Sequence, residues 1–450
     1  MTLDAARWSE RLGELVRAHG VPGATLAVHA HGELTTCTAG YVNTATRVEA
    51  TTDAVFPIAS ISKVWTAAAA MRLVERGLLD LDEPLGDVLP ELRLPVCDGE
   101  PAIALRHLLS HTSGIDMDNF VDTGRGADAL ERYVATCSEL QRLTAPGVAF
   151  SYGNAGFNIA GRMIERVTGQ VWDDAMRDLL FEPLGLERTI TLPEDGLLHR
   201  TAVGHLGGRP AAGWPVPRSA GPAGGIFSSA SDLIRFARLH LDEGIAASGE
   251  RLLSAASVAA MQECLVRPLD ARTADGWGLG WMLLDWDGTR VIGHDGGSVG
   301  ITAFLRIVPS TGTAIALMHN GGDGTGLYRA LLTELLSELH GIAPTPIEQP
   351  PAERVALDLD RYVGVYRRPS WQLDVEAEGD RLVATLHVEE PVSTELGADT
   401  IELELEALDA TRFVERRRGS DEAWSAVAFV EIPDHGRFVH MSWRTTPIVP

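Results

Sequence analysis

The sequence predicts an α+β protein, with a larger domain built on one antiparallel sheet and, after it, a small antiparallel barrel or sandwich. At 450 residues the chain is too long for a single ordinary core. Strand patterns stand at both ends of residues 1–343 and helical patterns lie between them, which is typical of an α+β domain. Residues 344–351 contain four prolines and are predicted to be a linker, and short alternating strands follow in residues 352–450.

Hydrophobic periodicity places the elements of the first domain. Helices are predicted over residues 4–18, from about 60 to 75, and over 105–114, 155–168, 172–184, 231–241 and 328–339. Strands are predicted over residues 24–30, 34–42, 278–284, 291–294, 303–309 and 313–320. Residues 116–126 and 197–222 have little periodicity and are interpreted as surface loops, the first of them as a candidate lid.

The second domain is predicted to contain six short strands, separated by turn signals such as Gly379-Asp380. They cover residues 372–377, 381–386, 400–405, 411–416, 426–432 and 438–443.

Composition narrows the function classes. A net charge of −24 argues against nucleic acid and against anionic membrane surfaces as partners, because both would repel the protein. The N-terminus has no signal-peptide pattern and no apolar run approaches the ~20 residues that span a bilayer, so a cytoplasmic location is expected. The four cysteines form no C-x-x-C pair and are interpreted as reduced core residues.

One pair of residues points to chemistry. Lys63 is the only lysine among the 38 lysines and arginines, and Ser60 precedes it by three positions at the start of an alanine-rich helix. Positions i and i+3 share a helix face, so the hydroxyl and the amine are expected to meet. A desolvated lysine can lose its proton near neutral pH, whereas arginine cannot. The alternative without catalysis is that Ser60 caps the helix and Lys63 is a solvated charge.

Two further motifs follow in order, Tyr152-Gly153-Asn154 and His294-Asp295-Gly296. Together with Ser60-x-x-Lys63, with residues 106–114 and with residues 221–225, they resemble the serine β-lactamase and penicillin-binding-protein family. The resemblance covers roughly residues 5–340 and implies that family's fold. A short match at residues 361–366 resembles the start of the lipocalin-like barrel that some members carry.

The resemblance implies a covalent acyl-enzyme mechanism. Ser60 would attack a carbonyl group, Lys63 would accept its proton, and Tyr152 would pass a proton to the leaving group, with a phenol pKa lowered by Lys63. His111 lies in a turn that ends a helix and is interpreted as a hydrogen-bonded structural residue.

Substrate contacts are assigned to Asn154, Gly296 and Ser298. The backbone N–H groups of Ser60 and Ser298 are expected to form the oxyanion hole. His294 is predicted to be catalytic and stands where relatives place a cation that binds a substrate carboxylate, so a neutral imidazole there weakens the case for β-lactams.

No metal and no cofactor is expected, because the sequence has no H-E-x-x-H, no paired His/Cys spacing, no P-loop and no dinucleotide fingerprint. Four tryptophans are predicted to flank the cleft, with core packing as the favoured role for at least two of them: Trp214, Trp277, Trp281 and Trp286.

The favoured function is a stand-alone peptidyl thioesterase that releases and macrocyclises a carrier-bound nonribosomal peptide. Arg444 of the barrel is predicted to hold the peptide's terminal carboxylate, with Arg437 as a second candidate. The first alternative is an esterase or D-aminopeptidase-like hydrolase in the cytoplasm. The second is a catalytically silent scaffold or sensor, against which the retained Ser60, Lys63 and Tyr152 argue.

Overall fold

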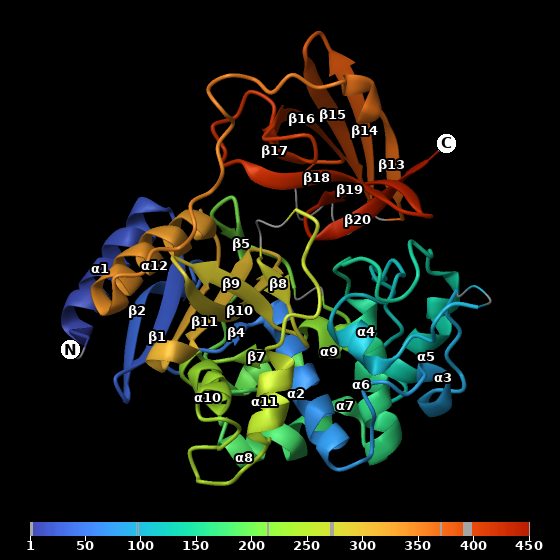
Figure 1. The fold of residues 1–450 in the computed structure, drawn as a ribbon. Coiled ribbons are helices and arrows are strands. Elements are labelled where there is room, and N and C mark those ends of the chain that lie inside the picture. The colour runs from blue at the N-terminus through green and yellow to red at the C-terminus, as the bar shows by residue number, and fades with distance from the viewer. Residues whose placement is uncertain are drawn as a thin grey trace.

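The computed structural model describes residues 3–449 except 96, 98, 214–215, 271–273, 370 and 390–397. Figure 1 shows a larger α+β body that carries a separate barrel at one end, with β18, β19 and β20 of the barrel nearest to the larger body. This confirms the predicted fold class. In the described part of the chain, no helix has both the length and the apolar character needed to cross a bilayer.

The larger body is organised around an eight-stranded sheet with the order β3-β2-β1-β12-β11-β10-β9-β8. Its paired strands are antiparallel, and β12 joins the N-terminal hairpin to the strands that precede it in the chain. The bounds are β1 Gly23–Ala30, β2 Glu33–Asn43, β3 Val48–Glu49, β8 Gly276–Trp277, β9 Met282–Trp286, β10 Thr289–Ser298, β11 Ile301–Val308 and β12 Thr313–His319. Two short pairs lie outside the sheet, β4 (Phe56–Pro57) with β7 (Phe227–Ser228) and β5 (His205–Leu206) with β6 (Arg209–Pro210).

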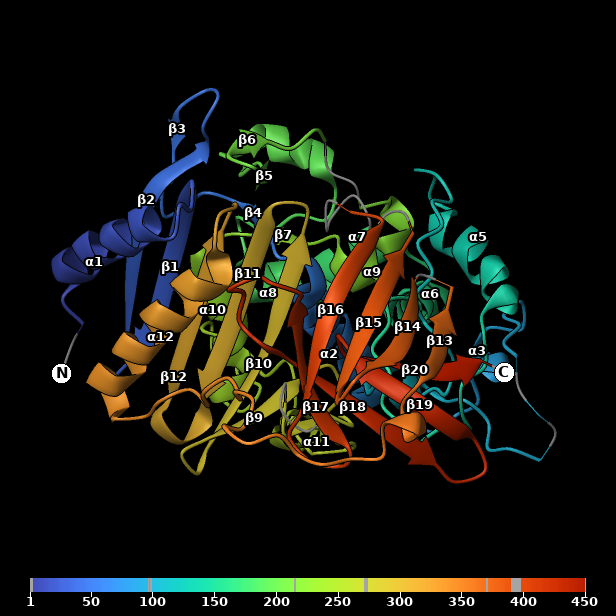
Figure 2. The same ribbon diagram turned by 90° about the horizontal axis from the view of Figure 1, so that it is seen from above.

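Helices cover both faces of the sheet. The first helix, α1 (Ala5–Ala18), and the last, α12 (Gly324–His340), lie together along one face, as Figure 2 shows, and bury a core that includes Trp8 and Leu331. The other helices gather on the opposite face around α2 (Ser62–Glu75). They are α3 Leu85–Val88, α4 Leu105–Leu109, α5 Ala129–Thr136, α6 Ala155–Thr168, α7 Trp172–Met176, α8 Glu182–Leu184, α9 Gly221–Gly224, α10 Ala230–Leu241 and α11 Ala255–Met261.

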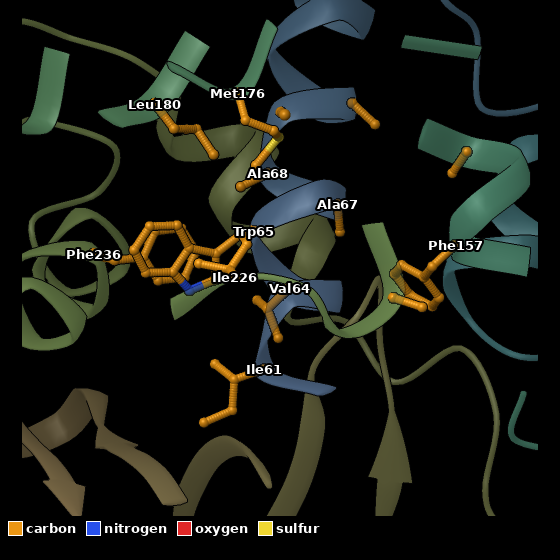
Figure 3. Packing of buried hydrophobic residues seen from close by; sticks show 14 of the residues in the cluster. Ile61, Val64, Trp65, Ala67, Ala68, Phe157, Met176, Leu180, Ile226 and Phe236 are labelled. Atoms are coloured by element: carbon orange, nitrogen blue, oxygen red, sulfur yellow. The ribbon is translucent and has the colours of Figure 1, made fainter. Parts of the chain in front are cut away.

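Helix α2 is the axis of this second core. It is buried from Ser62 to Leu73, and its run of alanines lets neighbouring elements approach closely. Trp65 stacks on Phe236 of α10 with ring centroids 4.2 Å apart, and Figure 3 shows Met176, Leu180 and Ile226 closing around the same side of the helix. A helix that is buried all round holds its first turn in a fixed place, which matters because Lys63 lies there and Ser60 lies in the turn just before it.

The barrel is closed by eight strands, and two of them were not among the six predicted. The additional strands are β13 (Gly364–Arg368) and β20 (Arg444–Val449), which pair with each other and so close the barrel. Arginines and a proline interrupt their apolar pattern, which hid them. The others are β14 Trp371–Glu378, β15 Arg381–Val388, β16 Thr400–Ala407, β17 Arg412–Arg417, β18 Ser425–Ile432 and β19 Gly436–Met441.

Some local predictions were wrong. Helix α12 begins at Gly324, four residues before the predicted start, because the Asp323 carboxylate accepts the N–H of Gly326 and caps the helix. The segment over residues 116–126 is not a surface loop at its start, since Asp116 and Asp118 are buried. All four cysteines are free, but Cys97 and Cys264 are exposed rather than in the core.

Candidate active site

Ser60 lies at a sharp entry into α2. Ala59 has φ +44°, a left-handed conformation that costs a non-glycine residue about 1–3 kcal/mol. The neighbouring chain holds this entry, because Ile226 O accepts the N–H of Ile58 at 2.9 Å and Ile226 N–H donates to Ser62 Oγ at 3.0 Å. Ser60 is left partly exposed, while Lys63, one turn on, is completely buried. The nucleophile can therefore reach a substrate and the amine cannot reach water.

The Lys63 amine has three acceptors around it. Nζ lies 3.0 Å from Ser60 Oγ, 2.8 Å from Asn154 Oδ1 and 2.8 Å from the carbonyl oxygen of Ala223 in α9. A neutral amine has two hydrogens, which the amide and carbonyl oxygens can accept. Its lone pair then faces the Ser60 hydroxyl. This is the geometry that a base needs to take the proton of the serine.

Burial lowers the pKa of Lys63 to about 7. The carboxylate of Asp118 acts in the opposite direction, and the guanidinium of Arg444 lowers the pKa further. His111 and His294, the histidines near Lys63, stay neutral because burial lowers the pKa of His294 to about 3 and that of His111 well below its ordinary value. Of the groups around Ser60, Lys63 is therefore the one that changes charge near neutral pH.

We expect the rate at which Ser60 reacts to rise with pH through about 7 and then to level off, because only the neutral amine can accept the serine proton. The measurement is the rate of phosphonylation of Ser60 by a fluorophosphonate between pH 5.5 and 9.5, corrected for hydrolysis of the reagent. A midpoint near the ordinary lysine pKa of about 10.4 would contradict this assignment.

Tyr152 and Asn154 come from the chain that enters α6. Gly153 is required there, because a Cβ at this position would lie 2.3 Å from Met117 Cβ. Burial raises the pKa of Tyr152, and a hydrogen bond with the Ser60 side chain only partly opposes this. The expectation that Lys63 lowers the pKa of Tyr152 was wrong, since Lys63 has lost its charge at the high pH where the phenol would ionise. Tyr152 is a neutral phenol at pH 7.

His111 packs against Tyr152 and helps to fix its position. Its Nδ1 accepts the N–H of Gly153 at 3.2 Å, and its ring lies 4.3 Å from that of Tyr152 between centroids. Its own backbone is left-handed, with φ +58°. This agrees with the structural interpretation made from the sequence.

His294 and Gly296 reach the site from β10. The His294 ring is buried, its Nδ1–H donates to the carbonyl of Asp295 at 2.6 Å, and its centroid lies 6.2 Å from that of Tyr152. The ring is neutral, and its Nε2 is an acceptor without a partner among the described residues. Gly296 passes so close to the serine that a Cβ there would lie 2.0 Å from Ile58 O and 3.2 Å from Ser60 N. Ser298 lines an apolar groove next to these residues.

The barrel contributes one of the two predicted arginines. Arg444 is ion-paired with Asp118, and its guanidinium carbon lies 5.5 Å from the Tyr152 ring. Arg437 instead donates to the backbone carbonyl of Arg361 at 2.7 Å. The geometry brings Arg444 to the site without testing its predicted contact with a substrate carboxylate.

The tryptophans separate into two groups. Trp277 lies beside Tyr152 and His294, with centroid distances of 5.8 and 5.5 Å. Trp281 and Trp286 are core residues, and Trp214 lies outside the described residues.

Sequence reasoning missed four residues at this site: Asp116, Asp118, Arg368 and Trp443. The acidic pair stands in a segment without periodicity, and Arg368 stands in a strand that was not predicted. Trp443 was assigned to the end of the strand predicted over residues 438–443, whereas it lies in the turn after β19. The spacing of Asp116 and Asp118 before Tyr152 carried no recognisable motif.

The sequence comparisons agree with the motifs. The family model described as Beta-lactamase matches residues 8–338. "Penicillin-binding protein 4" of Amycolatopsis lactamdurans is 45% identical over 376 residues, which are 82% of this chain and 99% of that protein. "Esterase EstB" of Burkholderia gladioli is 34% identical over 204 residues, 41% of this chain and 52% of the esterase.

A solved structure extends the likeness to the barrel. The crystal structure of SurE superposes with a TM-score of 0.81 at 30% identity and covers 99% of both chains. A second structure, of SurE with D-Leu, gives a TM-score of 0.80. The family model alone spans most of the larger domain and includes Ser60, Tyr152 and His294 within its bounds. The chain belongs to the family of serine hydrolases that resemble β-lactamases and penicillin-binding proteins.

Proposed function

We propose that this protein forms a covalent acyl-enzyme on Ser60, with Lys63 as the base and Tyr152 as the proton relay. One observation carries the proposal: a completely buried amine lies 3.0 Å from a partly exposed serine hydroxyl and has a pKa of about 7. A structural lysine has no need of either property. A base for serine needs both, because it must be neutral and in contact with the hydroxyl.

The oxyanion of the acyl transfer step requires two backbone donors, and the N–H of Ser60 is one of them. For the other we assign Gly297 in place of Ser298. Ser298 and Ile301 pair across a two-residue turn, so the N–H of Ser298 faces β11. The preceding N–H, that of Gly297, then faces the free edge of β10 toward Ser60.

The acyl substrate we propose is a peptidyl thioester: Ser60 takes the peptidyl group with departure of the thiol, and the peptide's own amine then displaces Ser60 to give the cyclic amide. Three features support this choice. The groove beside Ser298 is lined mainly by apolar residues, which include Leu192, Val216 and Phe227, and its charged lining residue Arg218 is already ion-paired with Asp173, so the groove favours an uncharged side chain. His294 is neutral, so it offers no permanent cation to a free carboxylate. The relative SurE was crystallised with D-Leu, whose D configuration occurs in nonribosomal peptides beside the ordinary L configuration.

The test offers the protein a linear peptide carried as an N-acetylcysteamine thioester, with a D residue at the thioester end, and follows products by mass. We expect the cyclic peptide, lighter than the linear acid by one water, as the main product. Loss of both products in Ser60→Ala would attribute the reaction to this site. Linear acid alone would contradict cyclisation while leaving acyl-enzyme chemistry in place.

A hydrolase is the second candidate, and the 34% identity with Esterase EstB over 204 residues favours it. The same assay separates the two candidates when short-chain p-nitrophenyl esters and D-amino-acid amides are included. Fast turnover of those small substrates, with no cyclic product from the thioester, would favour the hydrolase.

A further inference from the structure

The barrel touches the catalytic domain at the residues that carry the chemistry. The turn between β19 and β20 lies against the segment before α6: the N–H of Tyr152 donates to the carbonyl of Trp443 at 2.9 Å. Thr445 Oγ1 donates to Phe150 O at 2.7 Å, and Thr445 N–H donates to Ser151 Oγ at 3.2 Å. Three successive residues of the tyrosine segment are therefore hydrogen-bonded to one hairpin of the barrel.

This hairpin has an unusual backbone. Met441 pairs with Arg444, so the turn consists of Ser442 and Trp443, and their φ values are +49° and +70°. A two-residue turn with both φ values positive favours Asn-Gly, and other residues adopt it at a cost. Here the second position holds a tryptophan whose ring lies 5.5 Å from that of Trp277, between centroids. The turn therefore holds Trp443, in a strained backbone conformation, at the position where the barrel contacts Tyr152.

An ion-pair cluster lies next to the turn. Arg368 of β13 is buried and forms ion pairs with Asp116 and Asp118. Its Nη2 lies 3.0 Å from Asp118 Oδ2. Arg444 of β20 also pairs with Asp118. The two carboxylates come from the catalytic domain and the two guanidinium groups from the barrel. A buried carboxylate needs such partners to stay ionised, because desolvation alone would raise its pKa.

The cluster continues to the base through one amide. Asn154 Nδ2 donates to Asp118 Oδ1 at 3.3 Å, and Asn154 Oδ1 accepts from Lys63 Nζ at 2.8 Å. The backbone supports the same link, since Met117 O accepts the N–H groups of Asn154 and Ala155 at 2.8 and 2.7 Å. An amide held by a carboxylate on one side can present only its oxygen to the amine on the other.

We propose that the barrel completes the catalytic machinery: Arg368 and Arg444 fix Asp118, and Asp118 fixes Asn154, which holds the Lys63 amine against Ser60. This inference rests on the proposed acyl-enzyme function and adds Asp118, Arg368 and Arg444 as positioning residues. On this view the barrel is part of the active site and does more than cover it.

The charges of the cluster give a readout that loss of packing would not give. The carboxylate of Asp118 favours the protonated form of Lys63 and the guanidinium of Arg444 disfavours it. The other groups that face the amine are Tyr152, His111 and His294, all neutral at pH 7. Removing the negative charge should move the acid limb of the rate profile to lower pH, and removing the positive charge should move it to higher pH.

The experiment compares Asp118→Asn and Arg444→Met with the wild-type protein, using phosphonylation of Ser60 by a fluorophosphonate. The Ser60 oxygen bonds to phosphorus, fluoride leaves, and the serine proton passes to Lys63. We expect limbs displaced in opposite directions and plateau rates lower by about 10²-fold, the typical effect of a misplaced catalytic group. Arg418→Met is the matched control, because it removes an exposed ion pair with Glu378 elsewhere on the barrel.

The proposal would be overturned if the acid limbs of the two variants' pH–rate profiles stay in place or move in the same direction. If either single variant fails to fold, as judged by circular dichroism and thermal melting, the charge-balanced variant Arg368→Met/Asp116→Asn decides. A plateau within fivefold of wild type in that variant would overturn the proposal, and any larger fall supports it. Failure of the wild-type protein to react at Ser60 would instead contradict the proposed function, and with it this inference.

Discussion

Replacing Lys63 by methionine is expected to leave a folded protein whose Ser60 is acylated more slowly by about 10²–10⁴-fold, the usual cost of removing a general base. Methionine has nearly the length of lysine and no amine. It can therefore fill the buried space beside Ser60 but cannot take the serine proton. The measurement is the pre-steady-state rate of acyl-enzyme formation with the thioester, followed by intact-protein mass.

Lys63→Arg is the companion variant and separates charge from basicity. A guanidinium keeps the positive charge and cannot be deprotonated near neutral pH, so this variant should be as slow as Lys63→Met. Because Lys63 is completely buried, the larger arginine side chain should also lower the melting temperature. Lys63→Met fits the buried space and therefore shows the rate loss without that destabilisation. Near-wild-type acylation in either variant would show that Lys63 is not the base.

The sequence predicts the nucleophile and the base because they lie within one short stretch of chain, with Ser60 in the turn that leads into α2 and Lys63 in the first turn of α2. Ser60 and Lys63 are three positions apart, and the i, i+3 geometry at the start of a helix is fixed by local structure. The lone lysine added a second, compositional signal. The structure places the two atoms 3.0 Å apart. Their chemical roles stay predictions until the variants are measured.

The fold class was predictable for a similar reason. Alternation and helical periodicity identify elements that bury one face, such as α1 with its buried Trp8, Leu12 and Val16. Sequence periodicity fails to identify an element that is stabilised by contacts with a distant segment and not by an apolar face. Strand β13 ends in the buried Arg368, which is stable there only because Asp116 and Asp118 meet it from the other domain. The sequence alone does not reveal these two carboxylates, so Arg368 stands outside every strand predicted from the sequence.

The same limit explains the missing part of the site. Asp118 and Arg444 are 326 positions apart, and no local pattern in either segment indicates that they meet. Arg444 was selected from its place in the barrel as a candidate for a substrate carboxylate, whereas in the structure a carboxylate of the protein itself holds it. The two uses are compatible only if a substrate carboxylate shares the guanidinium with Asp118, because Arg444 Nη1 also donates to Ser442 O at 2.9 Å.

Tyr152→Phe is expected to fold normally and to turn over about 10²–10⁴-fold more slowly on substrates whose leaving group must be protonated. The ring keeps its packing against His111 and Trp277, and its backbone N–H still donates to Trp443, so only the hydroxyl is lost. Tyr366→Phe is a matched control, since it removes a buried hydroxyl that donates to Tyr362 O at 2.9 Å within the barrel.

The leaving group makes this prediction specific to proton relay. Burial raises the pKa of Tyr152, so the phenol is a proton donor at pH 7 and cannot serve as the base. It should matter most for an amide, whose nitrogen cannot depart without a proton, and least for a p-nitrophenyl ester, whose phenolate departs unaided. We therefore expect Tyr152→Phe to slow acylation by a D-amino-acid amide far more than acylation by the nitrophenyl ester, when both are measured as single turnovers. Equal slowing of both substrates would instead indicate that Tyr152 only positions Ser60, with which its hydroxyl is hydrogen-bonded.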